Sequence, residues 1–151
     1  MDAQEIVRSL TLRGQTLCVA ESLTGGKMSD SIVSVPGASK VFLGGVVSYA
    51  ESVKQKVLGV QAETLQQFTA VSGQTACEMA AGVRRLMGAD YALSATGYAG
   101  PDGEDVGLVY IGFADANMCE SVECRFAGDR AEIRSQSVEK ALEILSKHLR
   151  A

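Results

Sequence analysis

Short apolar segments alternate with amphipathic ones along this chain, and this alternation limits the fold more than any other feature. The apolar segments have the length and composition of buried strands, and we expect them over 16–20, 41–49, 90–95, 106–114 and 119–126. The amphipathic segments have helical spacing or helix caps, and we expect helices over 3–13, 25–34, 51–57, 62–69, 72–87 and from 130 to the end. The order of these segments predicts an α/β fold, a three-layer α/β/α sandwich with a mixed sheet.

The length and the charge narrow the class of protein. With 151 residues and no linker, repeat or low-complexity stretch, we expect a single domain over 1–151. The net charge is −4 and the basic residues are scattered, which disfavours nucleic acid as a partner.

The sequence shows no signal for export or for a membrane span. Asp2, Glu5 and Arg8 interrupt the start, so we expect no signal peptide there, and no apolar run reaches the ~20 residues of a membrane helix. We expect a cytoplasmic protein without a membrane partner, and the sequence leaves a homo-oligomer open.

The cysteines and the one histidine do not favour a metal site. The four cysteines have no CxxC spacing, so a zinc site of the usual Cys/His type is not expected. Cys18 and Cys77 lie in apolar patterns, which predicts buried, reduced thiols. His148 lies close to the end of the chain, and we expect it to be a solvated helix-end residue rather than a catalytic base.

Three segments share one pattern, in which an apolar strand runs into a turn of small, hydroxyl-bearing or charged residues. They are VAESLTGG at 19–26, SATGYAGPDG at 94–103 and RFAGDR at 125–130. Ligands of α/β sheets bind at the carboxyl ends of strands, and helix N-termini favour anions, so the pattern suggests a phosphate-bearing ligand. No turn matches a nucleotide-binding signature, and the glycines could serve only tight connections. Two alternatives stay open: Ser22 and Thr24 bind ligand or cap a helix, and Glu21 contacts ligand or holds its turn.

A second set of polar residues surrounds the strand at 41–49. Ser39 follows a Pro-Gly turn before this strand, Tyr49 ends it, and Lys54 lies on the helix beyond. A serine nucleophile can be activated by a lysine of lowered pKa. The sequence therefore offers a Ser39–Lys54 pair, provided that the two turns flanking the strand fold towards each other.

Several blocks together resemble one known family. They are AESLTGG, VPGASKVFLGGVVSY followed by Lys54, LGVQAETL, AVSGQTACEMAAGVR, GADYALSATGYAGPDG, VGLVYIGFA and FAGDRAEIR. In this order they resemble the C-terminal domain of competence-damage-inducible protein A (CinA), over about residues 3–148. The resemblance implies a compact α/β/α fold and hydrolysis of the carboxamide of nicotinamide mononucleotide to nicotinic acid mononucleotide and ammonia. It implies no metal and no organic cofactor.

The resemblance also implies a set of site residues. Its catalytic group would be Ser39 as nucleophile, Lys54 as base and Tyr49 as proton relay. The phosphate would be bound by an arginine of the GDR segment or just after it. Arg130 is the first candidate and Arg134 is the second. The remaining nucleotide-binding positions come from the TGG and TGYAGP turns and are Thr24, Gly25, Gly26, Thr96, Gly97, Ala99 and Gly100.

The chain departs from the family pattern at three places. Leu23 replaces a frequent cysteine, Ala50 and Glu51 replace a hydroxyl residue and an asparagine before Lys54, and the loop at 102–107 is short and lacks a lysine. A glutamate beside Lys54 would raise the lysine pKa, the wrong direction for a base. Two alternatives to the amidase therefore remain: a protein that binds a pyridine nucleotide without turnover, and a purely structural protein.

Overall fold

The computed structural model describes residues 1–150 and contains one five-stranded sheet in this range. The strands are β1 (Leu17–Glu21), β2 (Phe42–Val47), β3 (Tyr91–Gly97), β4 (Leu108–Ala114) and β5 (Cys119–Arg125), in the spatial order β2-β1-β3-β4-β5. β1 pairs in parallel with both β2 and β3, whereas β4 pairs antiparallel with β3 and with β5. The sheet is therefore mixed, as predicted.

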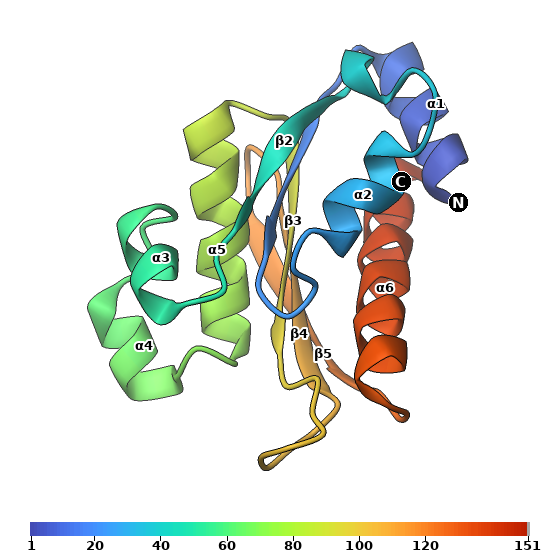
Figure 1. Cartoon of the computed structure of the whole chain (residues 1–151). Helices are drawn as coiled ribbons and strands as arrows, with labels where there is room; N and C mark the ends of the chain where they lie inside the picture. Colours follow the sequence, from blue (N-terminus) through green and yellow to red (C-terminus); the bar gives the residue numbers. More distant parts are fainter. Residues whose placement is uncertain (151) are drawn as a thin grey trace.

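Helices cover both faces of this sheet (Figure 1). On one side lie α3 (Glu51–Lys56), α4 (Ala62–Phe68) and α5 (Gly73–Met87). On the other side lie α1 (Ala3–Arg13), α2 (Lys27–Val33) and α6 (Arg130–Arg150). A short 3₁₀ turn, η1 (Ala38–Lys40), precedes β2 and was not predicted. The three-layer sandwich is confirmed.

Helix ends coincide with the residues whose chemistry favours them. The side chain of Ser72 accepts a hydrogen bond from the Thr75 N–H at the start of α5, and Gly88 ends that helix in the left-handed conformation. Asp129 and Glu132 form a capping box at the start of α6, with N–H···O distances of 2.9 and 3.0 Å. Local sequence thus sets the bounds of the helices before any tertiary contact is considered.

The two faces of the sheet bury separate apolar clusters. The larger lies between the sheet and α1, α2 and α6, and includes Leu93, Ile111 and Phe113. The smaller lies under α5 and includes Met79 and Val83. Because both faces are covered, β1 is buried along its whole length, which explains why it reads as a continuous apolar run.

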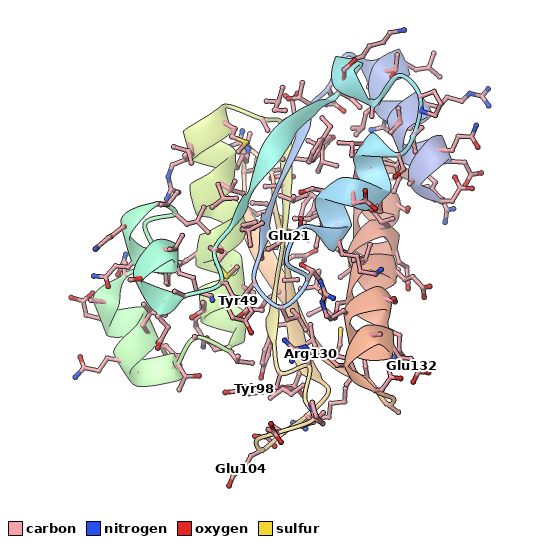
Figure 2. All side chains as sticks on the ribbon, in the orientation of Figure 1. Glu21, Tyr49, Tyr98, Glu104, Arg130 and Glu132 are labelled. Atoms are coloured by element: carbon pink, nitrogen blue, oxygen red, sulfur yellow. A yellow bond between two sulfur atoms is a disulfide. The ribbon has the colours of Figure 1, made fainter. Side chains whose placement is uncertain are left out.

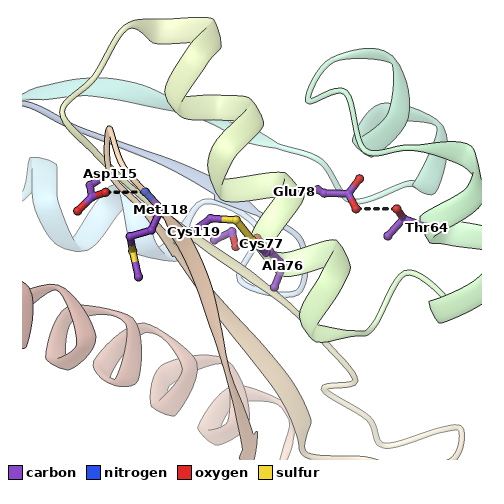
Figure 3. The surroundings of a disulfide bond; sticks show 8 residues. Thr64, Ala76, Cys77, Glu78, Asp115, Met118 and Cys119 are labelled. Carbon is purple, nitrogen blue, oxygen red and sulfur yellow. Dashed lines mark hydrogen bonds between the residues drawn. A yellow bond between two sulfur atoms is a disulfide. The ribbon is translucent and has the colours of Figure 1, made fainter.

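The cysteines differ from the expectation. Cys77 on α5 and Cys119 at the start of β5 form a disulfide (Figure 3). Helix α5 packs across β5, and this brings the two Cα atoms to 5.5 Å, within the range that a disulfide requires. The expectation of reduced thiols was therefore wrong for Cys77. Cys18 is a buried free thiol as expected, and burial raises its pKa to about 12.

His148 also differs from the expectation of a solvated helix end. Its ring stacks on Phe113 with the centroids 3.7 Å apart, and its Nε2 lies 2.6 Å from a carboxylate oxygen of Glu120. The histidine is half-buried because α6 lies against the sheet along its whole length. Its role in the fold is to join the end of α6 to β4 and β5.

Within residues 1–150, no helix has both the length and the apolar character needed to cross a bilayer.

Candidate active site

A cavity of about 410 Å³ opens where the three parallel strands end. Residues following β1, β2 and β3 line it, together with the α4–α5 connection and the first residue of α6. Figure 2 shows Tyr49, Tyr98 and Arg130 gathered at this end of the sheet, with Glu104 farther out on the 98–107 loop. This is the edge at which α/β sheets bind ligands, and the volume lies within the range of roughly 300–1,000 Å³ of small-molecule sites. The lining consists of Ser22, Leu23, Tyr49, Glu51, Lys54, Ala70, Val71, Thr96, Gly97, Tyr98, Ala99, Gly100, Asp102 and Arg130.

Lys54 is the most unusual residue of this lining, because its side chain is only 2% exposed. Its Nζ lies 2.9 Å from Ser22 Oγ and donates hydrogen bonds to the carbonyl oxygens of Ser48, at 3.0 Å, and Tyr49, at 3.3 Å. Burial lowers the pKa of Lys54, and the nearby carboxylate of Glu51 opposes this by a smaller amount. The structure thus pairs a serine hydroxyl with a buried amine that loses its proton more easily than a free lysine.

The serine of this pair is not the predicted one. Ser39 is exposed on η1 and borders a different hollow, beside Pro36 and Phe42. Ser39 precedes β2 and Lys54 follows it, and the six residues of that strand separate its ends by about 17 Å. The Ser39–Lys54 pair is therefore wrong, because an extended strand holds its two flanking turns apart.

Ser22 was left open between ligand binding and helix capping, and the structure excludes the capping role. Glu21, fully buried, caps α2 instead: it accepts hydrogen bonds from the N–H groups of Met28 and Ser29, at 2.7 and 2.9 Å, and from Ser29 Oγ, at 2.7 Å. Glu21 is thus an acid that holds its turn. The carboxylate fixes the turn that starts at Ser22 and leaves the Ser22 hydroxyl to the cavity.

Glu21→Gln is expected to lower the free energy of unfolding by roughly 2 kcal/mol, since an amide cannot accept all three bonds and a charged acceptor is lost. Thermal or urea unfolding measures this, with Glu132→Gln as the matched control. Glu132 is an exposed acceptor at the start of α6, where glutamine is also a good capping residue. Equal losses in the two variants would contradict the role given to Glu21.

The predicted residues of the TGG turn do not line the cavity. Thr24 is fully buried, and Gly25 and Gly26 take left-handed conformations with φ of 57° and 108° that turn the chain into α2. Arg134 donates to the carbonyl oxygens of Leu23, at 2.8 Å, and Thr24, at 2.9 Å. Ligand contacts of these three residues stay a prediction that the lining of this cavity does not support. Arg134 holds the turn, which leaves Arg130 as the arginine that faces the cavity.

The other predicted positions do line the cavity. Thr96 and Gly97 at the end of β3, with Ala99 and Gly100 directly after it, form one wall of the cavity. Thr96 Oγ1 donates to the carbonyl oxygen of Ala70 at 2.7 Å, which joins this wall to the α4–α5 connection. Gly97 has no room for a side chain, since a Cβ there would lie 2.7 Å from the carbonyl oxygen of Leu108. The wall is therefore held close against β4.

Arg130 and Tyr49 meet across the mouth of the cavity. The guanidinium of Arg130 donates to the carbonyl oxygen of Gly100, and its Nη2 lies 3.5 Å from the Tyr49 hydroxyl. The Tyr49 side chain is 65% exposed. Lys54, Tyr49 and Arg130 are thus brought together as predicted, around Ser22 in place of Ser39.

The expectation that helix N-termini would bind an anion is not met at two of the three turns. Glu21 occupies the N–H groups at the start of α2, and Asp129 accepts the N–H of Glu132 at the start of α6. The chain's own carboxylates therefore fill both positions. The third turn, after β3, leads into β4 and not into a helix.

Ser22 was left undecided from the sequence, and Tyr98 and Asp102 were not assigned to the site, although all three line the cavity. Glu51 lies beside Lys54 and acts on its pKa in the direction expected. Their position in the sequence could have indicated Ser22 and Tyr98, since each directly follows a parallel strand. Within residues 1–150, no three or more His, Cys, Asp or Glu side chains are arranged to hold a metal ion.

The sequence of this chain matches a known protein family. The family model described as the CinA C-terminal domain matches residues 2–149. A CinA-like protein of Thermotoga neapolitana is 45% identical over 149 residues, which are 96% of this chain and 36% of that protein. A CinA-like protein of Endomicrobium trichonymphae is 46% identical over 94% of this chain and 34% of its own length. The chain thus spans just over a third of such relatives.

Solved structures agree over almost the whole chain. The crystal structure of the competence/damage inducible protein CihA from Agrobacterium tumefaciens has a TM-score of 0.94 and 37% identity, and the match covers 99% of this chain and 93% of that one. A CinA superfamily protein from Klebsiella pneumoniae has a TM-score of 0.93 and 35% identity, with 97% and 94% covered.

Proposed function

The chain belongs to the CinA C-terminal domain family, and on this basis we propose that it is an amidohydrolase that converts nicotinamide mononucleotide to nicotinic acid mononucleotide and ammonia. The observation that carries the proposal is the 2.9 Å contact between Ser22 Oγ and the buried Lys54 Nζ at the floor of the cavity. Serine paired with a lysine of lowered pKa is a known arrangement for acyl transfer.

The hydrogen bonds of Lys54 suit a neutral amine that acts as a base. A neutral amine has two N–H groups and one lone pair, and the carbonyl oxygens of Ser48 and Tyr49 accept the two N–H groups. The lone pair is then directed at the Ser22 hydroxyl, which donates its proton to Nζ as Oγ attacks the carboxamide carbon. Lys54 next gives this proton to the amide nitrogen, which leaves as ammonia. Water cleaves the Ser22 ester, releases the carboxylate and restores the serine.

Other lining residues support the same steps. Leu23 follows Ser22, and its backbone N–H, with those of Ala99 and Gly100, is a candidate donor to the oxyanion. The guanidinium of Arg130 is the cation that would bind the phosphate, and the Tyr49 hydroxyl beside it would orient the substrate or relay a proton. The substrate is a free nucleotide, which fits a cytoplasmic protein.

A protein that binds the nucleotide without turnover is the second candidate, and Glu51 favours it. Its carboxylate stabilises the protonated form of Lys54 and so raises the pKa that burial lowers. Ammonia release from nicotinamide mononucleotide by the purified protein, with chelator present, separates the two. Release supports the amidase, whereas binding without release supports the second candidate.

Glu51→Gln is expected to shift the acidic limb of the kcat/KM profile to lower pH. The active form has neutral Lys54, so activity rises with pH through the lysine pKa, and loss of a nearby negative charge lowers this pKa further. Steady-state rates across a pH series measure the shift. Glu63→Gln, an exposed change on α4 outside the lining, serves as the control. An unchanged limb in the Glu51 variant would remove Glu51 from this role.

A further inference from the structure

Tyr98 presents an uncovered aromatic ring to the cavity. The backbone at this residue is fixed, because its N–H donates to the Leu108 carbonyl at 3.0 Å and its carbonyl accepts from the Gly107 N–H at 2.8 Å. The side chain is nevertheless 40% exposed and lines the cavity (Figure 2). A ring that is held at its base and left open on its surface is available to stack on a ligand.

The charged groups that line the cavity with Tyr98 are of both signs. Glu51 from α3 and Asp102 from the 98–107 loop both line the cavity, whose cationic groups are Arg130 and the buried Lys54. That loop also carries Glu104 and Asp105. The two nearby helix N-termini are filled by Glu21 and Asp129, so backbone groups there add no free anion site. Such a cavity suits a ligand with a positively charged part as well as an anionic one.

A cation over the face of a tyrosine ring gains about 0.5–2 kcal/mol, and nearby carboxylates add to the attraction. We propose that Tyr98, with Glu51 and Asp102, forms a subsite for the positively charged aromatic ring of the ligand and selects N-substituted pyridinium rings over uncharged ones. This inference rests on the proposed function, because it assumes that a pyridine nucleotide occupies the cavity. It assigns to Tyr98 a part in binding and none in bond cleavage.

The test compares two probes that share carboxamide, ribose and phosphate: nicotinamide mononucleotide and its reduced 1,4-dihydro form, whose ring is uncharged. Dissociation constants are measured with the full chain carrying Ser22→Ala, so that no turnover interferes. We expect tighter binding of the charged form, and a preference that falls about 2- to 30-fold when Tyr98→Leu is added. Tyr98→Phe keeps the ring and is expected to keep the preference, whereas Asp102→Asn and Glu51→Gln each reduce it.

Equal binding of the two probes, or a Tyr98→Leu variant that weakens both equally, would overturn the inference. Failure of nicotinamide mononucleotide to bind would overturn it too. If the wild-type chain releases ammonia but the two probes bind equally well, only this inference is lost and the proposed amidase function stands. A Tyr98-dependent preference without ammonia release retains the subsite and removes the amidase. Thermal unfolding of Tyr98→Leu verifies that the half-exposed change leaves the fold intact.

Discussion

Ser22→Ala is expected to lower kcat for nicotinamide mononucleotide by at least about 10³-fold, the scale seen when a serine nucleophile is removed. The reason is that the proposed mechanism uses the Ser22 hydroxyl, which contacts Lys54 in the cavity, as the nucleophile. Binding should change little, because alanine removes one oxygen and leaves the surrounding lining in place. Ammonia release measures kcat, and calorimetry with the nucleotide measures binding.

Ser39→Ala is the matched control for this experiment. Ser39 is exposed on η1, at the opposite end of β2 from Lys54, and full activity is expected without it. A variant set in which Ser39→Ala is inactive and Ser22→Ala is active would overturn the assignment of the nucleophile.

Lys54→Met should lower kcat by roughly 10²–10⁴-fold, the usual contribution of a general base. Methionine keeps an unbranched apolar chain in the buried position but has no lone pair of comparable basicity to take the Ser22 proton. Lys54→Arg should be inactive as well, since a guanidinium stays protonated. Single-turnover kinetics separates this loss from an effect on binding.

Lys56→Met on the same short helix is the control, because that lysine is exposed and lies outside the cavity lining. Its activity should equal that of the wild type. Circular dichroism establishes that each variant is folded. A Lys54→Met protein that retains turnover would exclude lysine as the base.

The element pattern was predictable because local signals and tertiary structure agree in this chain. Gly14 and Gly88 end helices where the sequence indicates, and the capping box of Asp129 and Glu132 starts α6 as expected. The continuous apolar run of β1 follows from burial on both faces. Helix caps depend on neighbours in sequence, and an apolar run reflects burial directly. Both can therefore be predicted from the sequence.

The Ser22–Lys54 contact was not predictable in the same way, because it joins segments that are distant in sequence. Ser22 and Lys54 are 32 residues apart in sequence and meet only because β1 and β2 are parallel neighbours that end together. Ser39 is nearer to Lys54 in sequence, but the rigid extension of β2 separates them. The Cys77–Cys119 disulfide was missed for a related reason, since it joins a helix to a strand 42 residues away.

The start of α1 and the end of α6 lie side by side, away from the cavity (Figure 1). Met1 accepts a hydrogen bond from Ser146, and the 21 residues of α6 carry the chain about 30 Å from Arg130, at the cavity, to Arg150. Polypeptide fused at either terminus would therefore extend away from the mouth of the site. The same fold can therefore be joined to further domains without any remodelling of the cavity mouth.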